Sequence, residues 1–452
     1  MRSLALFILM TLGLSSASTA QEAVTVGANS RVKIDRHNVC RMVENLAQTP
    51  FMVATRDSSE WSIGSSSFLN VVPPDVRLSA CRDNFCPIGS ENFKKRAVFD
   101  ITHPVFSIQD DFVVGNTGNR PFVTEGVYSI WTRDGAGWSK EREYPGITGY
   151  PRSSISGHGN RILVKDLAST DLSFFEIGRS GSTFSGAALK TVGNVPGGSV
   201  YALSEMNDDG DAVIAMQFEL EGDAFEITRN ADGSWSRKSV LPAPALSRRT
   251  LLNAQLFNDG SNAYLSGTFG PDSARRTWGS VYRKSGNSWS IVQNFRDDIP
   301  MVASRNGLFA YAVTGDGFVN TSTPGTLKVW SRDSVEQNFS ELNTVTVPNS
   351  AGADYTKCCR GLPQPTYDGE TVYVMTGSQW IGGGGVQAFR YNGTRFVNAG
   401  MAMVDEGESR QMQDEPSRHL FVSGSGKWFG VSQQSTGGDP HRKSLFGIGC
   451  GG

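Results

Sequence analysis

The sequence has no long apolar segment after Leu14, few histidines and few charged residues. With only five histidines, none at ligand spacing from a cysteine pair, a zinc site has little support. The formal net charge of −2 gives no general attraction for nucleic acid. A Walker loop, a nucleophile elbow and a paired metal-binding histidine motif are also lacking. We therefore expect no metal, no cofactor, no nucleic-acid partner and no membrane span.

The first twenty residues have the composition of an export signal. A positive start is followed by the apolar run Leu4–Leu14, and Ser18 and Ala20 occupy the −3 and −1 positions of a cleavage site. We expect residues 1–20 to be a signal peptide, and the mature chain to be secreted or periplasmic and monomeric. In the alternative, this segment is an uncleaved anchor helix, but the apolar run is shorter than a membrane-spanning helix needs.

A hairpin pattern recurs along the mature chain. Each copy alternates apolar and polar residues, passes through a turn with Gly, Asn or Asp, and opens its next strand with an aromatic residue. The marking aromatic recurs about every fifty residues, which is a propeller period. The six copies are Val127–Ser139, Phe174–Ser185, Ala224–Ser236, Ser280–Ser290, Leu327–Ser340 and Gln387–Val397. Because packing explains a tryptophan or phenylalanine at the same place in every copy, we expect these aromatics to be structural.

A second, glycine-containing hairpin accompanies each of these copies. Examples are Asn207–Met216 and Tyr367–Gly377. Two hairpins make the four strands of one propeller blade, and the 51 glycines fit many tight turns. The sequence therefore predicts an all-β fold in which residues 21–452 form a single β-propeller, with a pair of β-sandwiches as the alternative.

The two ends of the chain are predicted to share one blade. Thr55 and Trp61 repeat the spacing of Thr132 and Trp138, so this N-terminal hairpin is expected to supply the outer half of a blade. The hairpin around residues 418–432 supplies its inner half. Six internal blades and this composite one give seven, with six or eight as alternatives. Residues 65–100 are expected to be an irregular insertion.

The six cysteines predict disulfides in an exported protein. Sequence proximity favours a bond between Cys81 and Cys86 and another between the neighbours Cys358 and Cys359. Cys40 and Cys450 would then be joined near the seam of the ring. In the alternative pairing, Cys358 and Cys359 are bonded to Cys40 and Cys450.

The hairpins are similar to those of FG-GAP-like and kelch-like propellers, which place an aromatic after a glycine turn. They also resemble degenerate Asp boxes of sialidase-type propellers, although no copy fits that pattern. The segment Asn207–Asp211 resembles an FG-GAP calcium loop, but it occurs once, and a plain Asx-Gly turn is favoured.

About twenty residues around Cys358–Cys359 and Tyr367–Gly369 resemble the adjacent-cysteine disulfide region of quinoprotein alcohol dehydrogenases. In that family the disulfide packs against the quinone at the central site. Because the tryptophan-docking repeat of the family is absent, the resemblance implies only that such a pair lies at the propeller mouth.

Cationic residues precede several predicted inner strands, where radial repetition would gather them near the central axis. Guanidinium groups so gathered would attract a carboxylate, sulfate or phosphate. The candidate ligand-binding residues are Arg152, Arg249, Arg360, Arg418, His103, His419, Cys358 and Cys359. In the alternative interpretation, the arginines pair with acidic neighbours such as Asp297, Asp354 and Asp414.

Three functions remain open from the sequence. The favoured one is an extracytoplasmic binding protein that recognises a carbohydrate, an anionic ligand or a surface protein at the propeller mouth. The first alternative is a lyase or hydrolase acting on an acidic polysaccharide, with His103, His419, Tyr150, Arg152 and Arg418 as its reacting groups. The second is an oxidoreductase with a quinone-type cofactor at Cys358 and Cys359.

Overall fold

The protein is described by a computed structural model that divides into two compact units, Met1–Cys86 with Gly451, and Pro87–Cys450 with Gly452. In the first unit it describes β1 (Phe51–Thr55) and β2 (Trp61–Ser65), which form an antiparallel pair. In the second unit it describes residues 93–99, 102–117, 127–134, 137–147, 153–166, 172–192, 195, 201–217, 220–271, 276–296, 299–314, 325–347, 363–376, 385–403, 420–426, 428–432 and 443–448.

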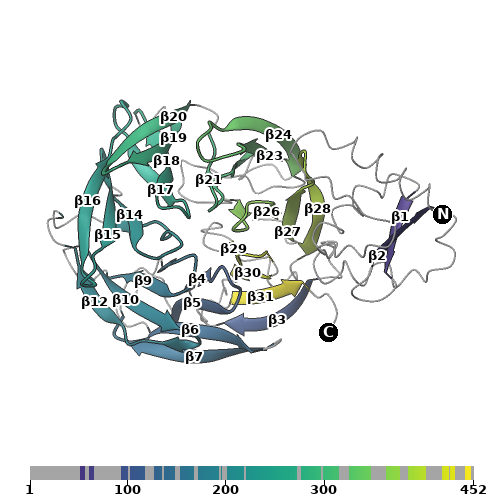
Figure 1. Ribbon diagram of the computed structural model, residues 1–452, viewed down its shortest axis with the longest axis horizontal. Helices are drawn as coiled ribbons and strands as arrows, with labels where there is room; N and C mark the ends of the chain where they lie inside the picture. Colours follow the sequence, from purple (N-terminus) through teal and green to yellow (C-terminus); the bar gives the residue numbers. More distant parts are fainter. Residues whose placement is uncertain are drawn as a thin grey trace, which may run out of the picture. The chain divides into compact units, whose positions relative to one another are not determined.

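The second unit is a ring of antiparallel sheets (Figure 1). In each sheet one strand lies nearest the axis and the others follow outward. The first three sheets contain β4 (Thr102–Phe106), β5 (Phe112–Thr117), β6 (Val127–Asp134) and β7 (Gly137–Pro145); β8 (Ser153–Ile155), β9 (Arg161–Lys165), β10 (Ser173–Ser180), β11 (Thr183–Phe184) and β12 (Ala188–Thr191); and β13 (Tyr201–Leu203), β14 (Ala212–Gln217), β15 (Ala224–Arg229) and β16 (Trp235–Leu241). In the second of these, β11 and β12 both pair with β10 and together take the place of one outer strand.

Four more sheets complete the ring. They contain β17 (Thr250–Leu256), β18 (Asn262–Phe269), β19 (Arg276–Ser285) and β20 (Ser288–Arg296); β21 (Val302–Ala303), β22 (Phe309–Thr314), β23 (Gly325–Ser331) and β24 (Ser340–Val347); β25 (Gln364–Pro365), β26 (Thr371–Thr376), β27 (Gly385–Tyr391) and β28 (Phe396–Met403); and β29 (Leu420–Val422), β30 (Trp428–Ser432), β31 (Lys443–Ile448) and β3 (Phe93–Phe99). The all-β fold and the seven-bladed propeller predicted from the sequence are confirmed.

The last sheet closes the ring with strands from both ends of the chain. Its outer strand β3 pairs with β31, so the prediction of a shared blade is confirmed. The prediction that the hairpin of Thr55 and Trp61 supplies the outer half is wrong, because β1 and β2 form a two-stranded sheet of their own. The strand that supplies the outer position is β3, which lies within residues 65–100, the stretch expected to be an irregular insertion. All six cysteines lie outside the described residues.

The core consists of apolar layers between neighbouring sheets. Strand β14 shows why the sequence alternation is weak in the second strands: Val213 packs toward the preceding sheet and Ile214 toward the following one, and both are fully buried. A strand that is buried on both faces needs apolar residues at successive positions. Within the described residues there is no helix of the length and hydrophobicity that a membrane crossing needs.

Two of the repeated tryptophans join neighbouring sheets through buried carboxylates. Trp235 of β16 donates its indole N–H to Glu176 of the preceding sheet at 2.9 Å, and Trp289 of β20 donates to Glu226 at 3.1 Å. Both indoles are buried, as is each glutamate. These two tryptophans therefore have the structural role expected of them. Each packs between two blades, and its indole N–H is hydrogen-bonded.

Candidate functional site: the polar turns around the axis

Seven tight turns join the innermost strand of each sheet to its second strand. Six of them begin with Ser, Thr or Asn, and that side-chain oxygen accepts the backbone N–H five residues later, which fixes the turn. These bonds are Ser107 to Phe112 at 3.2 Å, Ser156 to Arg161 at 3.1 Å, Asn207 to Ala212 at 3.0 Å, Ser304 to Phe309 at 3.0 Å, Thr366 to Thr371 at 3.1 Å and Ser423 to Trp428 at 3.1 Å. Asn207–Asp211 thus forms an Asx-Gly turn, as favoured from the sequence.

The fourth residue of each turn has a positive φ. Glycine fills this position in six turns, as at Gly210 with φ 71° and Gly369 with φ 74°. The exception is Asp110, which has φ 61°. A side chain in this region of backbone conformation is unfavourable and points to a local role that offsets the strain.

The turns are bonded to one another in a closed circuit. Each donates to, or accepts from, the turn of the next sheet around the ring. The contacts are Gln109 Nε2 to Gly157 O at 2.5 Å, Gly157 N to Asn207 O at 3.4 Å, Asp208 N to Asn258 O at 3.0 Å, Asn258 N to Arg305 O at 2.9 Å, Asn306 N to Tyr367 O at 3.4 Å, Tyr367 N to Gly424 O at 2.9 Å and Ser425 N to Asp110 Oδ1 at 3.2 Å. The circuit crosses the seam between the last sheet and the first without a gap.

Asp110 makes the contact at that seam. Its carboxylate accepts both the backbone N–H and the hydroxyl of Ser425, and its side chain is buried. Gly424 lets the two turns approach, because a Cβ there would lie 2.5 Å from the carbonyl oxygen of Ile108. The strained Asp110 is therefore the clasp that joins the two ends of the ring through side-chain hydrogen bonds.

Replacing Asp110 by alanine is expected to lower the free energy of unfolding by about 2 kcal/mol, because Ser425 loses an acceptor while the positive φ remains. Asparagine tolerates this φ and keeps an amide oxygen, so Asp110→Asn is the matched control and is expected to lose less than half as much. Urea unfolding followed by fluorescence measures both. Equal losses in the two variants would contradict the clasp.

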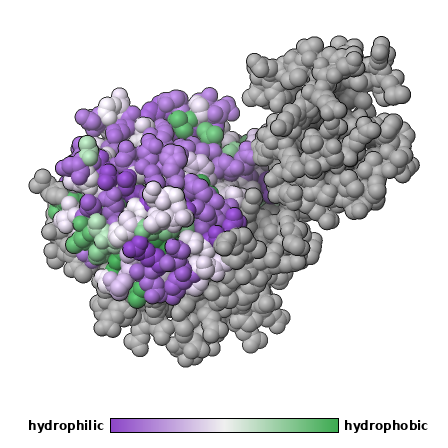
Figure 2. Space-filling view, turned by 60° about the horizontal axis from the view of Figure 1, so that its bottom comes forward, coloured by the Kyte–Doolittle hydropathy of each residue, from purple (hydrophilic) through white to green (hydrophobic). Residues whose placement is uncertain are grey.

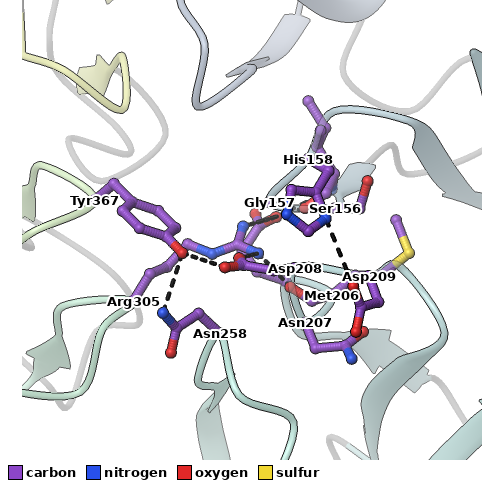
Figure 3. Close-up of polar contacts among 12 residues, drawn as sticks. Ser156, Gly157, His158, Met206, Asn207, Asp208, Asp209, Asn258, Arg305 and Tyr367 are labelled. Atoms are coloured by element: carbon purple, nitrogen blue, oxygen red, sulfur yellow. Dashed lines mark hydrogen bonds and ion pairs between the residues drawn. The ribbon is translucent and has the colours of Figure 1, made fainter.

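Polar side chains from four of the turns converge on the axis (Figure 3). They occupy the second position of their turns and belong to consecutive sheets. The other three turns carry small or apolar residues at this position. The four are Asp208, Asn258, Arg305 and Tyr367, and the three are Gly424, Ile108 and Gly157. Space left by the small residues admits the larger ones, since a Cβ on Gly157 would lie 1.7 Å from Asp208 Oδ1.

Tyr367 reaches across the ring. Its hydroxyl donates to Asp208 Oδ2 at 2.5 Å and accepts from Asn258 Nδ2 at 3.1 Å. Burial, together with its bond to the Asp208 carboxylate, raises the pKa of Tyr367 to about 12. The phenol is therefore neutral near pH 7 and serves as a hydrogen-bond donor to Asp208.

Arg305 fills the centre of the cluster with a side chain that is 15% exposed. Its guanidinium donates to the carbonyl oxygen of Ile155 at 3.1 Å and to that of Met206. Glu205 Oε2 lies 3.5 Å away and Asp208 Oδ1 3.9 Å away. The guanidinium also lies 5.8 Å from the centroid of the Tyr367 ring. The guanidinium thus has two carbonyl acceptors and two carboxylates within 4 Å, while its buried Nε makes no hydrogen bond to the described residues.

The chemistry available to this cluster is limited. His158 is exposed, and its Nδ1 lies 3.6 Å from Asp209 Oδ1, a pair that is charged only when the imidazole is protonated. No group of His, Cys, Asp or Glu suited to a metal ion occurs among the residues that the structure describes. The contacts of the axial cluster link four consecutive sheets by hydrogen bonds and ion pairs, which gives it a structural role.

Most ligand-binding candidates from the sequence lie outside the described residues: Arg152, Arg360, Arg418, His419, Cys358 and Cys359. His103 is described by its backbone alone, in β4. Arg249, just before β17, pairs with Glu221 at 2.5 Å and Asp223 at 3.7 Å. Its surroundings match the alternative of local pairing, with partners other than those expected, and its role toward a ligand stays a prediction.

The axial cluster was not predicted from the sequence, although a signal for it exists. Tyr367 was assigned to a hairpin and to the segment near Cys358 and Cys359, and no role was predicted for Arg305. The Ser, Thr or Asn placed three residues before the turn Gly marks the start of most turns, and the residue that follows this marker faces the axis. Aligning the turns on the marker brings Asp208, Arg305 and Tyr367 to one position.

Comparisons with known proteins identify no family for this chain. No family model matches the chain, and no curated protein does. Among solved structures, the periplasmic gluconolactonase of Pseudomonas aeruginosa matches at 14% identity over 75% of this chain and 96% of its own, with a TM-score of 0.43. The C-terminal WD40 domain of Sif2 matches at 11% identity over 80% and 99%, with a TM-score of 0.46. A hypothetical selenium-binding protein of Sulfolobus tokodaii matches at 7% identity over 75% and 83%, with a TM-score of 0.47. This likeness concerns the fold, and no activity is carried over from it.

Proposed function

We propose that this chain is an extracytoplasmic binding protein that takes an anionic ligand, such as an acidic carbohydrate, at the end of the ring opposite the seven turns. The observation that carries the proposal is the axial cluster. Arg305, Tyr367 and Asp208 are committed to one another and to backbone carbonyls. Because these groups at the turn end already contact one another, we assign the ligand to the opposite end.

Two long connections support this choice of end. One runs from β24 to β25 and contains Arg360, and the other runs from β28 to β29 and contains Arg418. They lead into neighbouring inner strands, because β25 packs beside β29. Long connections on a rigid scaffold commonly carry binding groups, and arginine suits carboxylate, sulfate and phosphate.

The described surface favours a polar ligand. Figure 2 shows a face on which hydrophilic residues predominate, with small apolar areas between them. Among the described residues, the exposed large hydrophobic ones are Leu189, Leu220 and Val240. A surface of this kind fits recognition by charge and hydrogen bonds better than recognition by an extended apolar patch.

Binding of oligogalacturonate to the mature protein, measured by calorimetry, tests the proposal. The double variant Arg360→Ala and Arg418→Ala is expected to weaken binding by at least about tenfold, in keeping with the loss of charge-assisted hydrogen bonds. The matched control is Arg395→Ala, an exposed arginine in the turn between β27 and β28, and it is expected to bind as the unmodified protein does.

Three results would overturn this function. The first is no binding to oligogalacturonate, to sulfated sugars or to phosphate. The second is equal binding by the double variant and the unmodified protein. The third is conversion of the oligosaccharide to shorter or unsaturated products, which would make the chain an enzyme.

A further inference from the structure

Lys165 is a buried cation at the end of the ring where the ligand is proposed to bind. It is the last residue of β9, the strand that runs outward from the turn beginning at Ser156 to the opposite end of the second sheet. Its side chain shares a face of the strand with Leu163, whose neighbours form the apolar layer against the third sheet. Lys165 as a whole is 6% exposed.

The ammonium of Lys165 has few partners for a buried charge. It donates one hydrogen bond, to the carbonyl oxygen of Asp166 at 3.2 Å, and it makes no ion pair within the described part of the chain. The Asp166 carboxylate is turned to another partner and accepts from Ser173 Oγ at 3.3 Å. Because a lysine ammonium has three N–H donors, two remain for another acceptor.

Among the described residues, the other cation that is as buried as Lys165 is Arg332, which donates to three backbone carbonyl oxygens. Several less buried cations contact carboxylates. Arg161 and Arg229 both contact Glu176, at 2.9 and 3.0 Å. Lys284 contacts Glu226 at 2.6 Å. A buried charge is costly unless it is paired, so a cation left with one carbonyl partner points to a missing anion. Burial lowers the pKa of Lys165 below its ordinary value, while the Asp166 carboxylate acts to raise it, which agrees with incomplete pairing.

We propose that Lys165 is an oxyanion-binding residue, and that a carboxylate, sulfate or phosphate of the ligand supplies its missing counter-charge. The inference rests on the proposed function and deepens it by naming a binding residue in the described part of the ring. The sequence next to β9 supports it. Ser153, the first residue of β8, pairs with Val164, the neighbour of Lys165, and the candidate Arg152 directly precedes Ser153 in the chain.

The test is to compare Lys165→Met with the unmodified mature protein in two measurements. The first is calorimetric binding of trigalacturonate, a sulfated trisaccharide and inorganic phosphate, with neutral trigalactose as the uncharged probe. The second is thermal unfolding without ligand. Lys238→Met, which removes an exposed lysine of β16, is the matched control.

We expect Lys165→Met to weaken binding of the preferred anion by about 10- to 100-fold, as expected for removal of one partner of a buried charge pair. The unfolding midpoint is expected to stay the same or to rise, because methionine buries an apolar chain where a poorly paired charge was. Lys238→Met should change neither quantity. The anion that binds most tightly identifies the chemical source of the oxyanion.

The outcomes separate this inference from the proposed function. If the unmodified protein binds none of the three anions, the proposed function fails, and Lys165 loses its role with it. If the unmodified protein binds an anion and Lys165→Met binds it equally well, only the role of Lys165 is refuted. A lower unfolding midpoint in Lys165→Met would also refute it, because Lys165 would then stabilise the fold by itself.

Discussion

Replacing Arg305 by alanine is expected to lower the free energy of unfolding by about 3 kcal/mol, the scale of breaking a largely buried ion pair on one side. The change leaves the carboxylates of Glu205 and Asp208 without their cation, at 3.5 and 3.9 Å in the native protein. It also leaves the carbonyl oxygens of Ile155 and Met206 without the guanidinium donors. Denaturant unfolding measures the loss.

Two variants make the interpretation of Arg305 specific. Arg395→Ala removes an exposed arginine and is expected to change stability by less than about 0.5 kcal/mol. Arg305→Lys keeps the charge but loses the planar fork, so it should recover only part of the stability. If Arg305→Ala were as stable as the unmodified protein or more so, the axial cluster would be a group held ready for a ligand, and its structural role would be refuted.

Replacing Glu226 by alanine is expected to lower the free energy of unfolding by about 3–5 kcal/mol, because the Lys284 ammonium then loses its fully buried carboxylate partner. Glu226 accepts from Lys284 Nζ at 2.6 Å, from Trp289 Nε1 at 3.1 Å and from Ser239 Oγ at 3.0 Å. These donors come from two neighbouring sheets, so the loss falls on an interface between blades. Denaturant unfolding with tryptophan fluorescence measures the free energy and also reports on Trp289.

The matched control for Glu226 is Glu143→Ala. Glu143 contacts Lys140 at 2.6 Å, the same distance, but both side chains are well exposed, so the expected loss is below about 1 kcal/mol. The double variant Glu226→Leu with Lys284→Met should regain much of the lost stability, since apolar side chains of similar size can replace a buried ion pair. A loss in Glu226→Ala as small as that of Glu143→Ala would show that the buried pair contributes nothing.

The blade repeat could be predicted because its signal is local. An aromatic such as Trp235 follows a polar turn at a fixed place in each of the six copies, and hydrogen bonding within a hairpin needs only neighbouring residues. The closing strand could not be found in this way. In β3 the register shifts between Lys95 and Ala97, which interrupts the alternation, and its partner β31 lies at the far end of the chain. The hairpin near Trp61 has the same local sequence pattern, but its strands pair only with each other and not with β31.

The axial cluster was hidden for a different reason. Asp208, Arg305 and Tyr367 lie in turns, where the sequence pattern reports backbone conformation and says nothing of side-chain direction. Only the ring geometry brings their side chains together. Lys165 was missed because it ends a short apolar strand, and its lack of a carboxylate partner is a property of three-dimensional packing.

The pairing of β3 with β31 also decides how the ring responds to force. The two strands are antiparallel, and Phe93, where the chain enters β3, is opposite Ile448, where it leaves β31. A pull on the flanking chain segments therefore acts on one residue pair first and opens the ladder like a zipper, one bond after another, instead of shearing all bonds at once. Tension on the two ends would therefore first separate β3 from β31 inside the last sheet, before it loads the contact of Asp110 with Ser425 between the last sheet and the first.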